Sequence, residues 1–383
     1  MYDLYGKLIG NLSNYLYTYI LIILLVAGGI YFTVRTKFVQ FRYLKESLRV
    51  VLAPSEDDKA ISSFQALMVS TASRVGTGNI AGVSTAICLG GLGSLFWMWL
   101  TALLGMSTAF VEGTLAQIYK RRSDDGGCYG GPSYYIDQAI GKHWLGILFA
   151  VFMILTYMVG FNLVASFNIA DAFRVIPAYS QNENLAKWII GGVLAVLFFV
   201  CISGGGKQIA GITEKIVPFM GFFYIAVALF VIVTHINLLP GVFAEIFRGA
   251  FDVKAIFGGF TGSAVMLGIK RGLFSNEAGV GAAACAAGSA GVSHPVKQGL
   301  IQALGVFIDT LVICSCSAFL MLLAPAEKIE GLMGMDLLQA AMNHHLGYAG
   351  VVFIAVVLFL FSFSTFLGIL YYARCNVAYV FGD

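Results

Sequence analysis

Two short stretches combine glycines with polar and charged residues inside otherwise apolar sequence. Residues 74–83 read RVGTGNIAGV, and residues 271–280 read RGLFSNEAGV. Glycines and small polar residues let a membrane helix unwind, which leaves backbone N–H and C=O groups without helical partners. Such groups are tolerated at membrane depth only where they line a cavity. Each stretch therefore predicts an interrupted helix at a binding site.

The groups freed at a helix break can bind two ligands of opposite charge. N–H groups at the start of the second half-helix favour a carboxylate, and carbonyls at the end of the first half can hold Na⁺. In the first stretch this chemistry falls on Gly76, Thr77, Gly78 and Asn79. One break can thus bind an anionic group and a cation together, so that each ligand completes the site of the other.

The glycines also have simpler interpretations. The first stretch matches a dinucleotide-binding pattern, but the flanking sequence predicts membrane helices and no preceding strand. Gly78/Gly82 and Gly268/Gly272 have the spacing that allows two helices to pack closely. Close packing alone does not explain the polar neighbours or their occurrence at two places.

Several ionisable residues lie in or near apolar segments, where a charge is costly and is usually paired or functional. They are Arg74, Glu112, Lys270, Arg271, Glu277 and Asp309. Arg271 could pair with Glu277, and Arg74 with a carboxylate of the other stretch, either as structural pairs or as gates. A proton relay through Glu112 or Asp309 is a further alternative.

Two other polar groups have competing interpretations. Ser364 and Thr365, in the last apolar segment, could bond to their own helix backbone or supply oxygens to Na⁺. The pair His344–His345 falls in a predicted external loop without a further ligand at metal spacing, so we expect it to be solvated. The sequence contains no metalloprotease, Walker or nucleophile-elbow motif and predicts no enzyme.

The composition shows which solvent surrounds these residues. Of 383 residues, 59% are hydrophobic and 11% are charged, and the mean hydropathy is +0.85. Soluble domains carry about a quarter charged residues. We therefore predict an all-α integral membrane protein with the lipid bilayer as its surroundings. The net charge of +3 includes no basic tract, so no nucleic-acid partner is expected.

Apolar segments long enough to cross a bilayer occur nine times. They are residues 16–34, 61–90, 93–119, 144–172, 187–203, 213–237, 252–288, 298–323 and 349–373. Segments 61–90 and 252–288 hold the two polar stretches and are too long for one straight crossing. Most lysines and arginines fall in alternate loops, which predicts an external N-terminus. Residues 38–52 alternate basic and apolar positions, as in an interfacial helix.

The two polar stretches belong to an internal repeat. They align without a gap, so that Asn79 matches Asn276, and the same offset places Glu112 on Asp309. Five spans separate the repeat starts, and an odd number inverts the second copy. We predict one transporter domain over residues 1–383. It comprises an N-terminal part (1–60), a first repeat (61–237) and a second repeat (252–383).

Taken together, these stretches resemble the alanine/glycine:cation symporters, the sodium:alanine symporter family. The resemblance covers nearly the whole chain and is carried by VGTGNIAGVSTAIC (75–88), FWMW (96–99), GGPSYY (130–135), GGGKQIAGITEKIVP (204–218), RGLFSNEAGVGAA (271–283), HPVKQG (294–299), GVFIDT (305–310) and FSTFLG (363–368). It implies a LeuT-like bundle of five-plus-five inverted helices in the plasma (inner) membrane. It also implies uptake of alanine or glycine with Na⁺, without an organic cofactor.

The resemblance assigns residues to two sites. The implied substrate residues are Gly76, Thr77, Gly78, Asn79, Ala165, Leu267, Gly268, Phe274, Ser275 and Ile369. Among these, the amides near Thr77 and Gly78 would bind the substrate carboxylate. The second break, around 267–275, would face the amino group and side chain. The implied sodium residues are Ala72, Val75, Ser364 and Thr365.

The sequence departs from the family pattern in three ways. Ala165 stands where glutamine is usual, and Ile369 where tryptophan is usual. Both changes predict a roomier pocket, for a larger neutral amino acid such as glutamine, serine or an aliphatic one. The sequence also reaches Asp383 after nine spans, whereas the family fold has two more scaffold helices in the second repeat.

The resulting prediction is sodium-coupled import of small neutral amino acids by alternating access. The same scaffold driven by protons is the alternative. A membrane enzyme would need a clustered acid/base or metal constellation, and a channel would need a continuous polar stripe. The sequence indicates no particular oligomeric state.

Overall fold

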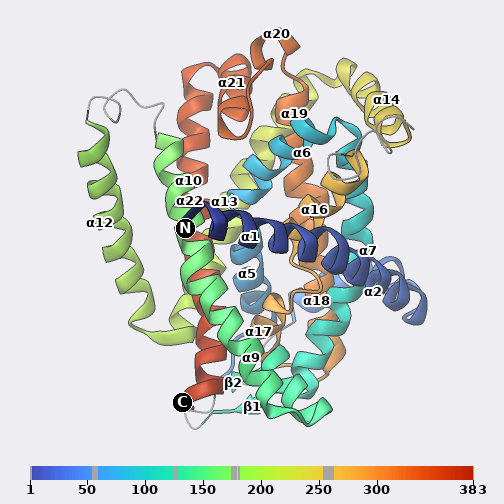
Figure 1. Cartoon of the computed structure of the whole chain (residues 1–383), viewed down its shortest axis with the longest axis vertical. Coiled ribbons are helices and arrows are strands. Elements are labelled where there is room, and N and C mark those ends of the chain that lie inside the picture. Colours follow the sequence, from blue (N-terminus) through green and yellow to red (C-terminus); the bar gives the residue numbers. More distant parts are fainter. Residues whose placement is uncertain are drawn as a thin grey trace.

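The computed structural model describes residues 2–53, 59–123, 127–173, 179, 182–252 and 263–382. Residues 253–262, which begin the predicted segment 252–288, lie outside this part of the chain, as do Arg174 and Lys254 of the predicted external loops. The described residues are mostly helical (Figure 1). The one pair of strands among them is the short hairpin of β1 (Arg121–Arg122) and β2 (Cys128–Tyr129).

The helical elements follow the predicted order of segments. The N-terminal part contains α1 (Tyr2–Tyr15), η1 (Leu16–Leu21), α2 (Ile22–Arg35), α3 (Val39–Arg42) and α4 (Leu44–Val51). The predicted first repeat contains α5 (Ser63–Arg74), η2 (Gly78–Gly82), α6 (Val83–Gly90), α7 (Gly93–Ile118), α8 (Pro132–Tyr135), η3 (Ile136–Ile140), α9 (His143–Ile154), η4 (Leu155–Phe161), α10 (Asn162–Ala172), α12 (Glu183–Ile202) and α13 (Gly205–Thr234).

The predicted second repeat and its approach complete the bundle. They contain η6 (Ile236–Leu238), α14 (Leu239–Ala250), α16 (Ala264–Asn276), α17 (Ala282–Gly288), α18 (Pro295–Val306), η8 (Phe307–Cys314), α19 (Ser315–Leu322), α20 (Ala326–Ile329), α21 (Met335–Leu346) and α22 (Tyr348–Phe381). In Figure 1, α14, α20 and α21 lie at one end of the bundle and the β1–β2 hairpin lies at the other.

Seven helices in the described residues are long and apolar enough to cross a bilayer. They are Gly6–Arg35, Gly93–Ile118, His143–Ala170, Glu183–Ile202, Gly205–Thr234, Pro295–Leu322 and Tyr348–Phe381. Each corresponds to one of the nine predicted segments. The other two segments, 61–90 and 252–288, are the ones expected to be interrupted, so the chain is a multi-pass membrane protein with two broken helices.

The first interrupted helix begins with a complete cap and ends at the predicted place. The Ser62 hydroxyl accepts from the Gln65 backbone N–H at 3.1 Å, and the Gln65 side chain accepts from the Ser62 backbone N–H at 2.9 Å. Helix α5 then stops after Arg74, and Val75 leaves helical geometry with ψ 85°. The helix resumes at Gly78, so residues 75–77 form the break.

The second interruption lies further along than predicted. Residues 267–275, expected to be unwound, belong to the continuous helix α16, and the break spans residues 277–281 instead. Glu277, Gly279 and Gly281 have φ values of 52°, 92° and 85° there. Glycine adopts this left-handed backbone at little cost, whereas a glutamate does so at a cost in strain. The break therefore follows the positions that reverse the backbone, not the positions that align with the first repeat.

The periphery of the bundle has the apolar surface expected of a protein in lipid. Helix α12 stands at its edge (Figure 1), and Leu194 and Cys201 are its buried residues. Large side chains such as Trp188 and Phe199 of this helix are exposed at 82% and 69%. Most polar residues around the two breaks lie in the interior, where the bundle shields them from lipid, whereas Lys270 reaches toward Asn14 and Tyr17 at the surface.

Candidate substrate and ion site

A cavity of about 250 Å³ lies where the two interrupted helices meet. It is lined by residues of the first break, the end of α16, η4 with α10, and α22, and its wall combines a larger apolar surface with several polar side chains. The lining comprises Ser73, Arg74, Gly76, Thr77, Gly78, Asn79, Ala81, Gly82, Thr85, Phe161, Val164, Ala165, Asn168, Arg271, Phe274, Ser275, Glu277, Ser362 and Thr365. Cavities of about 300–1,000 Å³ hold drug-sized ligands, so this one suits a smaller molecule.

The first break presents backbone groups to this cavity. At the start of η2, the N–H groups of Asn79, Ile80 and Ala81 already donate to the carbonyls of Gly76 and Thr77, which leaves the N–H groups of Thr77 and Gly78 for a ligand. Gly76 and Thr77 both line the cavity, and the Asn168 side chain of α10 donates to the Thr77 hydroxyl at 2.6 Å. A Cβ atom at Gly76 would lie 2.8 Å from Thr365 Oγ1, so only glycine allows the break to approach α22 this closely.

Asp309 joins the two interrupted helices. Its carboxylate is fully buried and accepts hydrogen bonds from Asn79 Nδ2 of η2 and, at 2.6 Å, from Ser275 Oγ of α16. Thr310 Oγ1 donates to the same carboxylate at 2.9 Å. An ionised carboxylate only accepts hydrogen bonds, and these three donors match that requirement. The Asn79–Asp309–Ser275 bridge therefore ties both helices to η8.

Glu277 makes a second connection between the two breaks. Ser73 Oγ, at the end of α5, lies 3.3 Å from one carboxylate oxygen of Glu277, and Tyr157 OH of η4 donates to that oxygen at 3.4 Å. Glu277 is 5% exposed and lines the cavity. These bonds hold the strained left-handed residue in place, so the geometry of one break depends on the other.

Arg74 is the cation that faces the buried carboxylates. It is 3% exposed and interacts electrostatically with Glu277, Asp309 and Glu112. Among the described residues, however, Arg74 forms no salt bridge with a carboxylate. Its Nη1 donates to Gln302 O at 3.5 Å, and its Nε and Nη2 have no hydrogen-bond partner there. The expected pairing of Arg74 with a carboxylate of the other stretch is therefore not formed. Glu112 accepts from the backbone N–H of Gly279 at 3.1 Å, so it supports the second break and is not part of the cavity wall.

Comparison with known proteins agrees with this geometry. Residues 2–383 match the sequence profile of the sodium:alanine symporter family. The chain belongs to the sodium:alanine symporter family. It is 45% identical over 382 residues to the probable sodium/glutamine symporter GlnT of Bacillus subtilis, covering 99% of this chain and 78% of that protein.

Two further relatives extend the comparison. The amino-acid carrier protein AlsT of Bacillus subtilis is 44% identical over 99% of this chain and 80% of its own length. The sodium/alanine symporter AgcS of Methanococcus maripaludis is 36% identical over 98% of this chain and 84% of its own length. As a member of this family, the chain is an amino-acid:cation symporter.

The symporter brings together most of the residues implied for the substrate. Those that line the cavity are Gly76, Thr77, Gly78, Asn79, Ala165, Phe274 and Ser275. Leu267 and Gly268 do not; they lie near the opposite end of α16 from the break, against α6 and α7. Ile369 is fully buried in the core beside α10 and is also outside the lining. The displaced break explains the positions of Leu267 and Gly268, because the cavity lies near residues 274–277.

Of the four residues implied for sodium, only Thr365 lines the cavity. Thr365 lines the cavity against Gly76, as described above. Ser364 donates to the Phe361 carbonyl at 2.9 Å and lies 3.5 Å from Met220 Sδ, away from the lining. Ala72 and Val75 are buried just before and within the break. The hydroxyl of Thr365 also donates to Phe361 O at 2.9 Å, so its own helix backbone currently holds it.

The sequence did not reveal several cavity residues of the symporter. Asn168 binds Thr77, Ser73 binds Glu277, and Phe161 stacks on Phe274 with ring centroids 5.8 Å apart. Asn168 is one of few amide side chains in the apolar segment 144–172, and a polar residue in such a segment could have marked it as a site residue. The role of Phe161 depends on packing between distant segments and has no local signal.

Gly268 gives a test of helix packing separate from transport chemistry. A Cβ atom at Gly268 would collide with the Ser94 carbonyl and lie 2.6 Å from Trp97 Cβ, both on α7. We expect Gly268→Ala to lower the free energy of unfolding by about 1–3 kcal/mol through overpacking. Thermal unfolding in detergent measures this. Gly221→Ala is the matched control, because a Cβ there meets no atom within 4 Å. Equal stabilities of the two variants would contradict the close packing of α16 against α7 at Gly268.

Proposed function

We propose that this symporter imports small neutral amino acids together with Na⁺ by alternating access. The observation that carries the proposal is the meeting of two interrupted helices at one cavity, with Thr365 Oγ1 against the break at Gly76. A break of this kind offers N–H groups to a carboxylate and carbonyls to a cation. The printed names of the relatives, sodium/alanine and sodium/glutamine symporters, support the same pair of ligands.

The substrate is proposed to lie with its carboxylate at the start of η2. Thr77 and Gly78 line the cavity there, and the positive end of the half-helix dipole favours an anion. Phe274, whose ring lies against Gly78, stacks beside Phe161, and the two rings offer an apolar surface for a substrate side chain. Glu277 and Ser275 provide oxygen acceptors for the substrate ammonium group.

Sodium is proposed to bind between the first break and α22. Na⁺ is a hard cation that prefers oxygen ligands. The Thr365 hydroxyl and the carbonyls at the end of α5, near Ala72 and Val75, would supply them, and Ser364 would join after a rotamer change that releases Phe361 O. The arrangement of two inverted repeats in a LeuT-like fold and an external N-terminus belong to the same proposal.

Ala165 is proposed to set the size of the substrate pocket. Its side chain is buried and lines the cavity beside Asn168. We expect Ala165→Gln to reduce glutamine uptake about tenfold relative to alanine uptake, a loss of about 1.4 kcal/mol, because the longer side chain fills part of the space. Competition by unlabelled amino acids against labelled alanine measures the ratio.

The matched control for this variant is Ser166→Gln, at the next residue of α10, which is exposed and outside the cavity lining. It should leave the selectivity unchanged. A strict alanine/glycine profile in the unmodified protein would show that the loss of bulk at Ala165 does not broaden the substrate range.

One experiment tests the proposed function as a whole. Purified protein in liposomes is given labelled alanine or glutamine with an inward Na⁺ gradient, or with K⁺ and an inward proton gradient. Sodium coupling predicts accumulation only in the first condition, and its collapse when a sodium ionophore is added. Accumulation driven by the proton gradient alone would favour the second candidate.

Proton coupling on the same scaffold would use the buried carboxylates. Asp309 accepts three hydrogen bonds, an arrangement that suits a fixed anion better than a carboxyl group that must be protonated and released. This observation favours Na⁺. Retention of Na⁺-driven uptake in Glu112→Gln would argue against proton coupling through Glu112, because that change removes its carboxyl group and Glu112 is not part of the cavity wall.

A further inference from the structure

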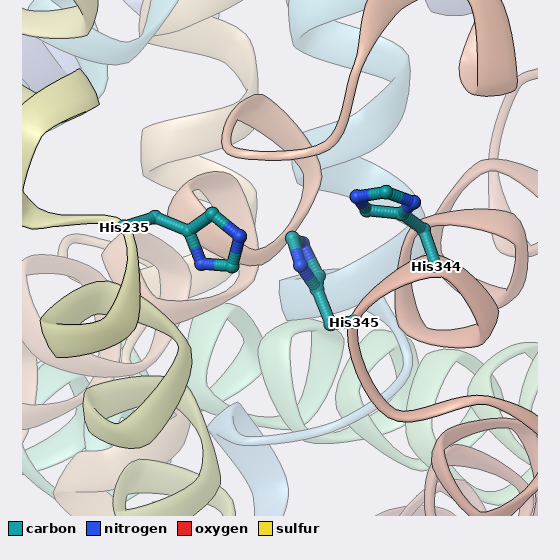
Figure 2. A group of neighbouring side chains, drawn as sticks. All are labelled: His235, His344 and His345. Atoms are coloured by element: carbon teal, nitrogen blue, oxygen red, sulfur yellow. The ribbon is translucent and has the colours of Figure 1, made fainter.

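Three of the five histidines of the chain meet at one end of the bundle. His235 follows the last residue of α13, and His344 and His345 occupy the last turn of α21. One ring nitrogen from each lies within 4.8 Å of the others. Figure 2 shows the His345 ring between the other two. Its centroid is 5.0 Å from that of His235 and 5.3 Å from that of His344. The expectation that His344 and His345 have no further ligand nearby is therefore wrong.

Backbone carbonyls orient two of these rings. Nε2 of His345 lies 3.0 Å from the Leu320 carbonyl, and Nδ1 of His235 lies 3.0 Å from the Val231 carbonyl. A carbonyl only accepts, so the ring nitrogen facing it must carry the proton. The other nitrogen, Nδ1 of His345 or Nε2 of His235, then presents a lone pair. Metal-binding histidines commonly have their second nitrogen held in this way.

The lone pair of His345 has no partner within the described structure. Its Nδ1 is buried and makes no hydrogen bond. A buried polar atom without a partner costs about 1–3 kcal/mol, so such atoms are rare. Burial, with a smaller contribution from the neighbouring histidines, also lowers the pKa of His345.

We propose that His235, His344 and His345 form a binding site for a borderline transition-metal ion, with Zn²⁺ as the best fit. Imidazole nitrogens are ligands for Zn²⁺, Ni²⁺ and Cu²⁺, and three histidines with one open position make a common zinc arrangement. Zn–N bonds of about 2.0–2.1 Å place tetrahedral ligands about 3.3 Å apart. The exposed His344 must therefore move inward as the ion binds.

The position of this three-histidine cluster connects it to the transport machinery. Helix α13 ends at the cluster, and α21 packs against η2 and α6, the second half of the first interrupted helix. An ion held by all three rings would join the end of α13 to α21. This restrains any movement of the half-helix relative to α13. The binding site stands on its own geometry, whereas this inhibitory effect rests on the proposed function.

Zinc binding by the purified full-length chain tests the site. Titration calorimetry with Zn²⁺ alone should show one site per chain, and His344→Ala or His235→Ala should weaken it at least tenfold. His344 is exposed, so its replacement is expected to leave folding intact. The matched controls are His143→Ala and His294→Ala, the two histidines outside the cluster. Binding unchanged by the cluster variants, or weakened equally by the controls, would overturn the site.

Uptake assays test the inhibitory effect separately. Micromolar Zn²⁺ should slow amino-acid uptake by the unmodified protein in liposomes and should not slow it in His344→Ala. If Zn²⁺ binds through these histidines but uptake is unaffected, the proposed inhibition of transport is refuted, and the binding site itself is supported. If the protein takes up no amino acid, the proposed function fails, and calorimetry still decides the site.

Discussion

Replacing Asn79 by alanine is expected to reduce amino-acid uptake strongly. Asn79 lines the cavity, and its side chain donates to Asp309 and lies 3.5 Å from Ser275 Oγ. Its own oxygen accepts from the Gly76 backbone N–H at 3.3 Å. Alanine removes all three interactions. The buried Asp309 carboxylate then loses one hydrogen-bond donor, and the Gly76 N–H in the first break loses its side-chain acceptor. Each lost partner costs about 1–3 kcal/mol.

A loss of that size predicts a fall in uptake of about tenfold to a hundredfold. Labelled alanine uptake in liposomes measures it, and size-exclusion chromatography verifies folding. Asn162→Ala is the matched control, since its side chain bonds only within its own helical segment, to Met158 O at 2.6 Å and to Tyr157 O at 3.4 Å. Normal uptake by Asn79→Ala would show that the bridge to Asp309 has no part in transport.

Replacing Thr365 by valine is expected to weaken sodium dependence while preserving shape. Valine keeps the volume and loses the hydroxyl that faces Gly76. If this oxygen is a sodium ligand, the Na⁺ concentration for half-maximal uptake should rise about tenfold, the effect of about 1.4 kcal/mol. Initial rates of labelled alanine uptake across a series of Na⁺ concentrations measure the shift.

Two variants help to interpret this result. Thr114→Val removes a hydroxyl that also bonds to its own helix, 2.7 Å from Phe110 O, but lies outside the cavity lining. It should leave the sodium response unchanged. Ser364→Ala distinguishes the second implied ligand, whose hydroxyl lies toward Met220. An unchanged sodium response in Thr365→Val would remove this hydroxyl from the proposed site.

The first break could be predicted because its signal is local. Gly76, Thr77 and Gly78 stand together in apolar sequence, and small polar residues have no other evident reason to occur there. The family resemblance supplied part of the surrounding cavity wall. Seven of the ten substrate residues implied by the family line the cavity, since the motifs that carry the resemblance lie beside the breaks.

The second break lies within the end of the polar stretch 271–280, but not at residues 267–275, which the family resemblance implied for it. Helix α16 continues through residues that match the first break and ends only where Glu277, Gly279 and Gly281 reverse the backbone. Leu267 and Gly268 consequently lie against the neighbouring helices. The three-histidine cluster was missed for a different reason. His235 is far from His344 in sequence, and only the packing of α13 against its neighbours brings them together.

The packing of α7 has a consequence for how the molecule could change shape. This helix makes its most extensive contacts with α18 and α16, and at Gly268 and Gly272 the backbones of α16 and α7 approach without intervening side chains. A contact that close leaves no room for sliding. Helices α7, α16 and α18 should therefore rock as one solid block. The movement that opens the cavity alternately to each side would then occur at the contacts of this block with α10, α13 and α22.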